Sequence, residues 1–277
     1  MDRGMRKMKI PISNKKLWGN FLKIASGISV VITTILAFVD FCPMVKYIVG
    51  GVFLGVLLGL FVILLIRANK MEHLTLQINN STVNIRFASI FEQTDLKVIA
   101  FNEYFDTQVD DIVISKNTLN GKYILEFAQK EELDRLIENS RHLSERKAET
   151  NAERKDGKKQ RYKLGTICKN GDYLLVALTH FDEDNRAYLT LQQYSDCLIN
   201  MWNEIDILYN QQSVSMPLLG SGVTRFKDCE VTDQELLEII LWTYRISKVK
   251  FTYPSCLNII LDERKKDKIN LYKLKGE

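Results

Sequence analysis

The chain has 277 residues, of which 46% are hydrophobic and 26% are charged, and its formal net charge is +4. Residues 1–70 hold ten of the 38 basic residues but two of the 34 acidic ones, so residues 71–277 carry a net charge of −4. A mildly acidic main part argues against a nucleic-acid partner, because nucleic-acid-binding proteins need a clustered positive surface.

The N-terminal part begins with a basic arm, residues 1–16, and continues with two apolar segments. Residues 17–39 and 47–66 each reach the length of about 20 residues that a helix needs to cross the hydrocarbon core of a membrane. A short turn around Pro43 separates them, which predicts a two-helix transmembrane hairpin over residues 17–70. A cleaved signal peptide would not be followed at once by a second span.

Basic residues flank the expected hairpin on the arm and just after the second span, whereas the turn carries one lysine and one aspartate. This bias places both termini in the cytoplasm. The second span also contains three glycines at four-residue spacing, Gly51, Gly55 and Gly59. Such a stripe lets helices approach closely, either within the hairpin or between copies, and we expect a homo-oligomer in the lipid bilayer.

Residues 71–277 contain several segments with the apolar pattern of strands. The expected strands are residues 74–78, 83–87, 96–101, 162–168, 173–179, 213–217, 257–261 and 269–274. The first two are expected to form a hairpin across Asn79-Asn80-Ser81, and the fourth and fifth a hairpin across Lys169-Asn170-Gly171-Asp172.

Helices are expected between these strands. Residues 131–145 form a charged amphipathic pattern, Thr190 can cap a helix that runs to about residue 209, and residues 232–235 form a capping box before a helix to residue 247. Residues 148–160 are polar and are expected to be a loop or a frayed helix end. The alternation predicts the α/β class, a three-layer α/β/α domain with a mixed sheet.

The most informative stretch follows the expected strand at residues 213–217. The chain there reads Gly220-Ser221-Gly222, followed by Val223. A strand that opens into a glycine loop brings backbone N–H groups to the carboxyl end of a sheet, where they can surround a phosphate. An ordinary tight turn is the alternative for so short a motif.

The sequence lacks the motifs that are typical of most catalytic mechanisms. The three histidines lie far apart without a ligand partner at regular spacing, and the five cysteines form no C-x-x-C pair, so no metal site is expected. The sequence contains no G-x-S-x-G elbow, no H-E-x-x-H motif and no lysine-bearing P-loop. No nucleophile is paired with a base, so neither catalytic residues nor a cofactor are expected.

The order of elements resembles that of macro domains, α/β modules that bind ADP-ribose, over roughly residues 82–262. Residues 98–102 resemble the family's strand that ends in asparagine, Asn120-Gly121 resembles a diverged first phosphate loop, and residues 215–223 resemble the second diphosphate loop. The resemblance implies a set of ligand-binding residues: Asn102, Asn120, Gly121, Pro217, Leu219, Gly220, Ser221, Gly222 and Val223.

Two departures from the family pattern bear on activity. The aspartate that typically holds adenine is replaced near Ala88-Ser89, and the asparagine pair of de-ADP-ribosylating macro domains is reduced to Asn102. Tyr104 and Phe105 stand where the second asparagine would fall. The resemblance therefore implies binding without hydrolysis, with a membrane-tethered ADP-ribosyl hydrolase or a non-catalytic ADP-ribose-binding anchor as alternatives.

Two apolar segments before a diverged macro domain, together with residues 101–107, resemble the membrane effectors of the Thoeris anti-phage defence system. The resemblance implies that a partner TIR-domain protein consumes NAD on infection and makes an ADP-ribose-derived nucleotide. The macro domain would bind this signal, and the protein would oligomerise and disrupt the bacterial inner membrane. The cell would then die or stop growing.

Overall fold

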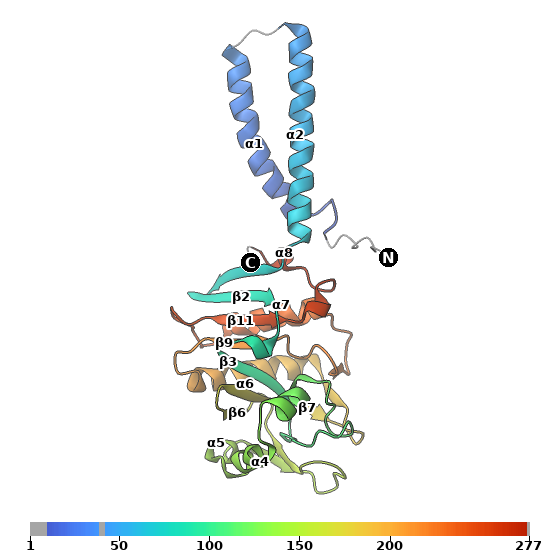
Figure 1. Cartoon of the computed structure of the whole chain (residues 1–277), viewed down its shortest axis with the longest axis vertical. Coiled ribbons are helices and arrows are strands. Elements are labelled where there is room, and N and C mark those ends of the chain that lie inside the picture. The colour runs from blue at the N-terminus through green and yellow to red at the C-terminus, as the bar shows by residue number, and fades with distance from the viewer. Residues whose placement is uncertain (1–9, 39–41, 276–277) are drawn as a thin grey trace. The chain divides into compact units, whose positions relative to one another are not determined.

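The computed structural model describes residues 10–38 and 42–275, which form two compact units. The first unit runs up to Glu72 and also contains Asn270–Lys275, whereas the second contains His73–Ile269. Figure 1 labels many of the helices and strands of both units. The two units are described in turn, because each has its own core.

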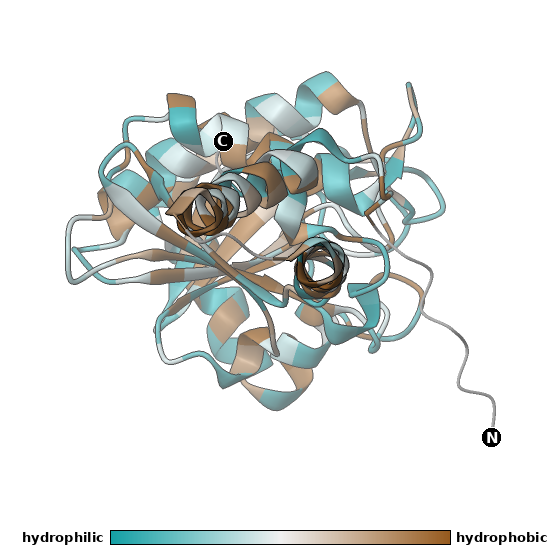
Figure 2. Ribbon diagram, turned by 90° about the horizontal axis from the view of Figure 1, so that it is seen from above, coloured by the Kyte–Doolittle hydropathy of each residue, from teal (hydrophilic) through white to brown (hydrophobic). Residues whose placement is uncertain are grey.

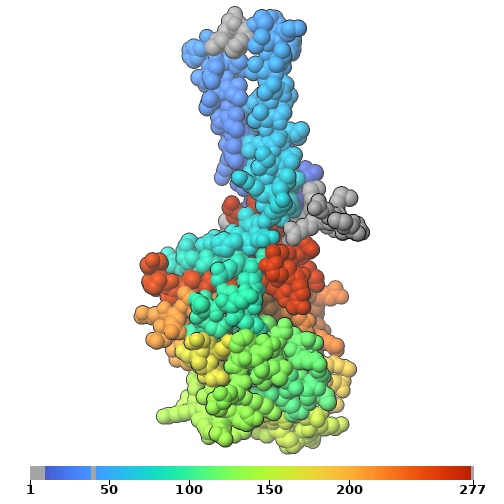
Figure 3. All heavy atoms as spheres, in the orientation of Figure 1, coloured from blue at the N-terminus to red at the C-terminus, as the bar shows by residue number. Residues whose placement is uncertain are grey.

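The first unit contains two long helices, α1 (Lys15–Phe38) and α2 (Pro43–Asn69), which confirms the two helices predicted from the sequence. By length and composition both could cross a membrane. Pro43 occupies the first turn of α2, where its missing N–H breaks no hydrogen bond. Figure 2 shows both helices end-on and mostly hydrophobic, and Figure 3 shows them as spheres. Part of the predicted turn, residues 39–41, lies outside the described residues, as does most of the basic arm.

The last described residues belong to the first unit. Residues 269–274 were predicted to be a strand, but Leu271–Leu274 form a short helix, α8, which Asn270 caps by accepting a hydrogen bond from the amide of Tyr272. Tyr272 is buried with Leu17 of α1 and Ala68 of α2, and its hydroxyl accepts a hydrogen bond from Asn20 at 2.8 Å. The strand prediction was wrong because apolar residues three apart also suit one helical turn.

The second unit is built on a mixed sheet with strand order β1-β2-β11-β9-β3-β7-β8-β10, in which β6 also pairs with β7. The strands are β1 (His73–Ile78), β2 (Ser81–Phe87), β3 (Leu96–Asn102), β6 (Ile167–Asn170), β7 (Tyr173–Phe181), β8 (Ala187–Leu189), β9 (Val214–Pro217), β10 (Arg225–Phe226) and β11 (Leu257–Leu261). The neighbours β2, β11, β9, β3 and β7 run parallel, so their carboxyl ends lie at one edge. This confirms the mixed sheet.

The strand predictions hold best where the pattern is local. Asn79 and Asn80 have φ angles of 52° and 63°, as a two-residue hairpin turn between β1 and β2 requires. The hairpin of β6 and β7 is also confirmed, but β6 begins at Ile167 instead of residue 162. Gly165, at φ 88°, redirects the chain just before it, and Gln160–Tyr162 form a separate strand, β5, that pairs with β4 (Lys147–Thr150).

Helices cover both faces of the sheet, as the view in Figure 2 shows, and this confirms the three-layer prediction. Thr190 and Thr232 cap α6 (Leu191–Leu208) and α7 (Asp233–Ile246), as predicted; the capping box expected at Thr232 is present, and Thr190 forms one as well. The helix expected at residues 131–145 is instead two helices, α4 (Lys130–Asn139) and α5 (Arg141–Ser144). Ser140 lies between them because its hydroxyl accepts a hydrogen bond from Leu143 and starts α5.

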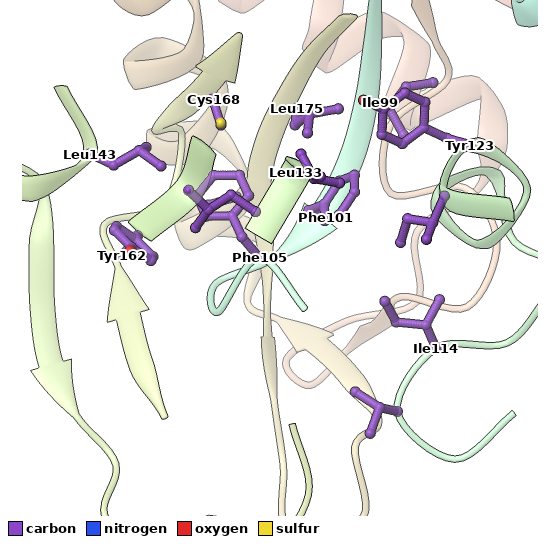
Figure 4. Packing of buried hydrophobic residues seen from close by; sticks show 14 of the residues in the cluster. Ile99, Phe101, Phe105, Ile114, Tyr123, Leu133, Leu143, Tyr162, Cys168 and Leu175 are labelled. Atoms are coloured by element: carbon purple, nitrogen blue, oxygen red, sulfur yellow. The ribbon is translucent and has the colours of Figure 1, made fainter. Parts of the chain in front are cut away.

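Residues from β3 and β7 form the centre of a large core with the helices beside them (Figure 4). Ile99 and Phe101 of β3 pack with Leu175 of β7, and Tyr123 lies against Phe101 at 6.1 Å between ring centroids. Tyr123 belongs to α3 (Leu119–Glu126). The short 3-10 helices η1 (Ile90–Glu92) and η2 (Glu263–Lys265) follow β2 and β11. The core thus fixes the strand ends that the candidate site uses.

Candidate ligand-binding site

The sheet brings together two parts of the predicted site that are far apart in sequence. Asn102 is the last residue of β3, and Pro217 is the last residue of β9. The two strands are parallel neighbours, so the segments that follow them lie at the same edge of the sheet. In open α/β sheets, ligands bind in the crevice outside the carboxyl ends of such strands.

The glycine loop, residues 218–223, leaves β9 and rises from the core to the surface. Leu219 is buried, and its carbonyl oxygen accepts a hydrogen bond from the Tyr194 hydroxyl at 2.8 Å. Gly220 has φ 77°, and a Cβ there would lie 3.1 Å from the Tyr194 ring, so this position requires glycine. Val223 is 66% exposed. The loop is therefore anchored at one end and open at the other.

The open end of the glycine loop presents backbone donors. The Ser221 amide donates to the Leu218 carbonyl at 3.3 Å and closes a turn. Within residues 10–38 and 42–275, the amides of Gly220, Gly222 and Val223 donate to no acceptor. Successive amides without internal partners can bind an anion such as a phosphate. Ligand binding by residues 217 and 219–223 remains a prediction.

A charged cluster lies directly beneath the loop. The Ser221 hydroxyl donates to the carboxylate of Asp233, the first residue of α7. The Lys265 ammonium, at the end of η2, donates to the Ser221 hydroxyl and lies 2.9 and 3.0 Å from the two Asp233 oxygens. Although desolvation acts to raise it, hydrogen bonds from Ser221 and Lys265 hold the pKa of Asp233 below its usual value. No spacing in the sequence predicts this cluster, because Ser221, Asp233 and Lys265 come from three different segments of the chain.

Asn102 is 2% exposed and takes part in the turn that follows β3. Its amide nitrogen donates to Asp106 at 2.8 Å, and its oxygen accepts from the backbone amides of Tyr104 and Asp106. Phe105, within this turn, has φ 49°, a value that few non-glycine residues adopt. Asn102 thus shapes the edge of the site from inside, and its predicted contact with a ligand remains a prediction.

A buried ion pair holds the segment that was expected to be a loop or frayed helix end. The Arg154 guanidinium lies 2.7 Å from Asp106 Oδ2 and stacks on the Tyr104 ring at 3.8 Å. The side chains of Arg154 and Asp106 are 6% and 1% exposed. Residues 148–160 therefore fold back onto the carboxyl end of β3. A pairing across 48 residues leaves no local sequence signal, so it was missed.

We expect Arg154→Met to lower the free energy of unfolding by about 3–5 kcal/mol, because it leaves the Asp106 charge buried without its partner. Chemical unfolding of the full chain in detergent measures the change. Lys155→Met is the matched control, since Lys155 is exposed beside it, and should stay within about 0.5 kcal/mol of the parent. Equal stability of the two variants would show that the ion pair does not anchor the segment.

A second polar pair lies beside this turn and was also missed. The His180 Nδ1 atom lies 2.8 Å from Glu103 Oε2, and Arg161 lies 3.5 Å from the other carboxylate oxygen. The Glu103 side chain is 4% exposed, so the Arg161 guanidinium and the His180 ring both lie against a buried carboxyl group. Within the described parts of the chain, no group of three or more His, Cys, Asp and Glu residues could hold a metal ion.

Asn120 and Gly121 lie in a helix, although an Asn-Gly pair is typical of a turn. They lie in the first turn of α3, where the Thr118 hydroxyl accepts from the Gly121 amide and donates to the Asn120 oxygen at 2.6 Å. A Cβ at Gly121 would lie 2.3 Å from the Ser115 carbonyl oxygen, so close packing accounts for this glycine. The capping threonine outweighed the turn signal, and a ligand contact here remains a prediction.

The three glycines of the predicted oligomerisation stripe lie on α2. A Cβ added at Gly51, Gly55 or Gly59 would meet no atom within 4 Å. Among the described residues, the stripe is therefore not packed closely against α1. Contact between copies is a prediction that the single chain does not test.

Comparisons with known proteins point to one family. A family model described as the macro domain of Thoeris protein ThsA matches residues 83–262. Thoeris protein ThsA of Bacillus amyloliquefaciens (strain Y2) is 42% identical over 277 residues, covering 98% of this chain and 93% of that protein. The match therefore includes the two N-terminal helices as well as the sheet.

Solved macrodomains of Oceanobacillus iheyensis show a more distant similarity. A form with ADP is 13% identical with a TM-score of 0.45, and covers 74% of this chain and 94% of its own. A form with MES bound is 14% identical with a TM-score of 0.47, and covers 74% and 96%.

Proposed function

The chain belongs to the Thoeris ThsA family, and we propose that it is the membrane effector of an anti-phage defence system. In this proposal its macro domain binds an ADP-ribose-derived signal, and binding turns the N-terminal helices into a membrane-disrupting assembly. The observation that carries the proposal is the glycine loop, whose open amides lie at the carboxyl ends of parallel strands. A diphosphate is the chemical group that such a loop recognises.

The proposed location is the bacterial inner membrane, with both termini in the cytoplasm. Two facts support it: α1 and α2 are long and apolar enough to span a bilayer, and basic residues flank them on the arm and after Ile66. The larger unit would then face the cytoplasm, where a nucleotide signal is made. We propose that a TIR-domain partner makes this signal from NAD, so the two proteins communicate through a diffusible product.

The proposed signal acts by differential affinity. A ligand can shift an equilibrium only as far as it binds one state more tightly than the other. The nucleotide must therefore prefer the assembled protein, and the exposed stripe of Gly51, Gly55 and Gly59 offers the surface on which copies would meet. Assembly would disrupt the membrane and stop the infected cell from supporting phage.

The proposed activity is binding without turnover. We expect the full chain in detergent to bind ADP-ribose, or the product of the TIR-domain protein and NAD, in calorimetric titration. We also expect no release of ADP-ribose from an ADP-ribosylated protein, because Asn102 is held inside its own turn and no second asparagine accompanies it.

Two outcomes would favour the alternatives. Release of ADP-ribose that is lost in Asn102→Ala would identify a membrane-tethered hydrolase. Failure to bind either ADP-ribose or the TIR product would leave a plain membrane anchor with a degenerate pocket. Both measurements use the same purified protein, so one preparation separates the three functions.

A further inference from the structure

Lys265 is the cation nearest to the glycine loop. Its ammonium group donates to the hydroxyl of Ser221, the central residue of Gly220-Ser221-Gly222. It also contacts both oxygens of Asp233, and the side chains of the pair are 23% and 11% exposed. The Ser221 hydroxyl thus contacts an ammonium group and a carboxylate, and its residue lies between Gly220 and Gly222, whose amides are open.

Asp233 is a carboxylate beside a site that is expected to bind an anion, which is unusual. It is the first residue of α7, where the helix dipole favours a negative charge, and it already neutralises Lys265. A phosphate on the glycine loop would come close to the Asp233 carboxylate, and like charges at short range repel each other. The same phosphate would attract Lys265, since charge-assisted hydrogen bonds are the strong ones.

We propose that Lys265 is a ligand-binding residue whose ammonium group stays paired with Asp233 until the ligand binds. This inference rests on the proposed function and adds the regulation of that same site. On binding, a phosphate of the nucleotide takes over the Lys265 ammonium and the Ser221 hydroxyl from the Asp233 carboxylate. Asp233 is then an internal competitor of the ligand, and it sets the concentration of signal at which the protein responds.

Lys265 lies shortly before the point where the chain enters the first unit again. Residues 266–269 lead from Lys265 to Asn270, where the chain enters the first unit and forms α8. Tyr272 of α8 packs against residues of α1 and α2. A change in the partner of Lys265 therefore occurs at the start of a short connection to the membrane helices.

The test compares two substitutions that should act in opposite directions. Calorimetric titration of the full chain in detergent with ADP-ribose, and separately with the TIR product, should give about tenfold weaker binding for Lys265→Met. Asp233→Asn should bind about threefold to tenfold more tightly, because the competing charge is gone. Lys268→Met removes a nearby charge that makes no direct contact with Ser221, and it should change affinity less than about twofold.

The outcomes separate this inference from the function on which it rests. If the ion pair only stabilises the loop, Lys265→Met and Asp233→Asn weaken binding alike, which overturns the inference and leaves the proposed function intact. If the parent binds neither nucleotide, the proposed function fails and the inference fails with it. Thermal unfolding of each variant identifies any that does not fold, and Lys265→Gln then replaces Lys265→Met with the same expected direction.

Discussion

Gly222→Glu is expected to weaken binding of the ADP-ribose-type ligand by at least about 100-fold, which corresponds to about 2.7 kcal/mol. Among the described residues no atom lies within 4 Å of a Cβ at Gly222, so the new side chain has room, but the φ of 156° is one that other residues rarely adopt, so some backbone strain accompanies the substitution. Its carboxylate would lie over the open amides, where it would occupy the donors and repel the phosphate. Calorimetric titration of the full chain measures the loss.

Gly171→Glu is the matched control for this substitution. Gly171 also has open space around a Cβ and a positive φ, 55°, so the substitution again strains the backbone, but it lies in the turn before β7, at the amino end of that parallel strand. The same charge is therefore added at the opposite edge of the sheet, and affinity should stay at the parent value. Undiminished binding by Gly222→Glu would show that the glycine loop does not hold the ligand.

Gly55→Leu is expected to reduce ligand-induced dye release from vesicles by at least about tenfold without changing ligand affinity. Apart from the adjoining turns of the helix itself, no atom of the described residues lies within 4 Å of a Cβ at this position, so a leucine should be tolerated by the single protein. Between copies, the added side chain would keep the α2 helices apart and remove the close backbone approach that a glycine stripe permits.

Val56→Leu controls for the added bulk. Val56 is 53% exposed on the same helix, and one residue along it turns the side chain by about 100° away from the stripe. This variant should release dye as the parent does. Equal release by Gly55→Leu and Val56→Leu would contradict assembly through the glycines.

Local signals in the sequence were enough to predict much of the fold. The cap at Thr190 and the capping box at Thr232 depend on residues at most three apart, and both helices begin where these threonines indicated. The two-asparagine turn between β1 and β2 is equally local. The strand that ends in Pro217 and the glycines after it could also be read directly, because strand pattern and turn residues adjoin there.

Features that depend on contacts between residues far apart in sequence could not be predicted from local patterns. Arg154 and Asp106 lie 48 residues apart, and Lys265 lies 44 residues from Ser221, so no spacing rule connects them. Residues 271–274 are too few for their apolar pattern to distinguish a strand from a helix. In the structure they form α8, and Tyr272 of α8 packs with residues of the two N-terminal helices. The candidate site was therefore predicted as a loop, without the charged groups that surround it.

Ligand-dependent leakage from vesicles tests whether binding of the nucleotide causes this protein to disrupt a membrane. The full chain is reconstituted in dye-filled vesicles, and the product of the TIR-domain protein and NAD is added at increasing concentration. We expect release that begins only with the ligand, reaches half its maximum near the calorimetric dissociation constant, and is absent in Gly222→Glu. Dye release that is independent of the ligand would contradict the proposed function. So would an absence of dye release when the parent protein is saturated with ligand.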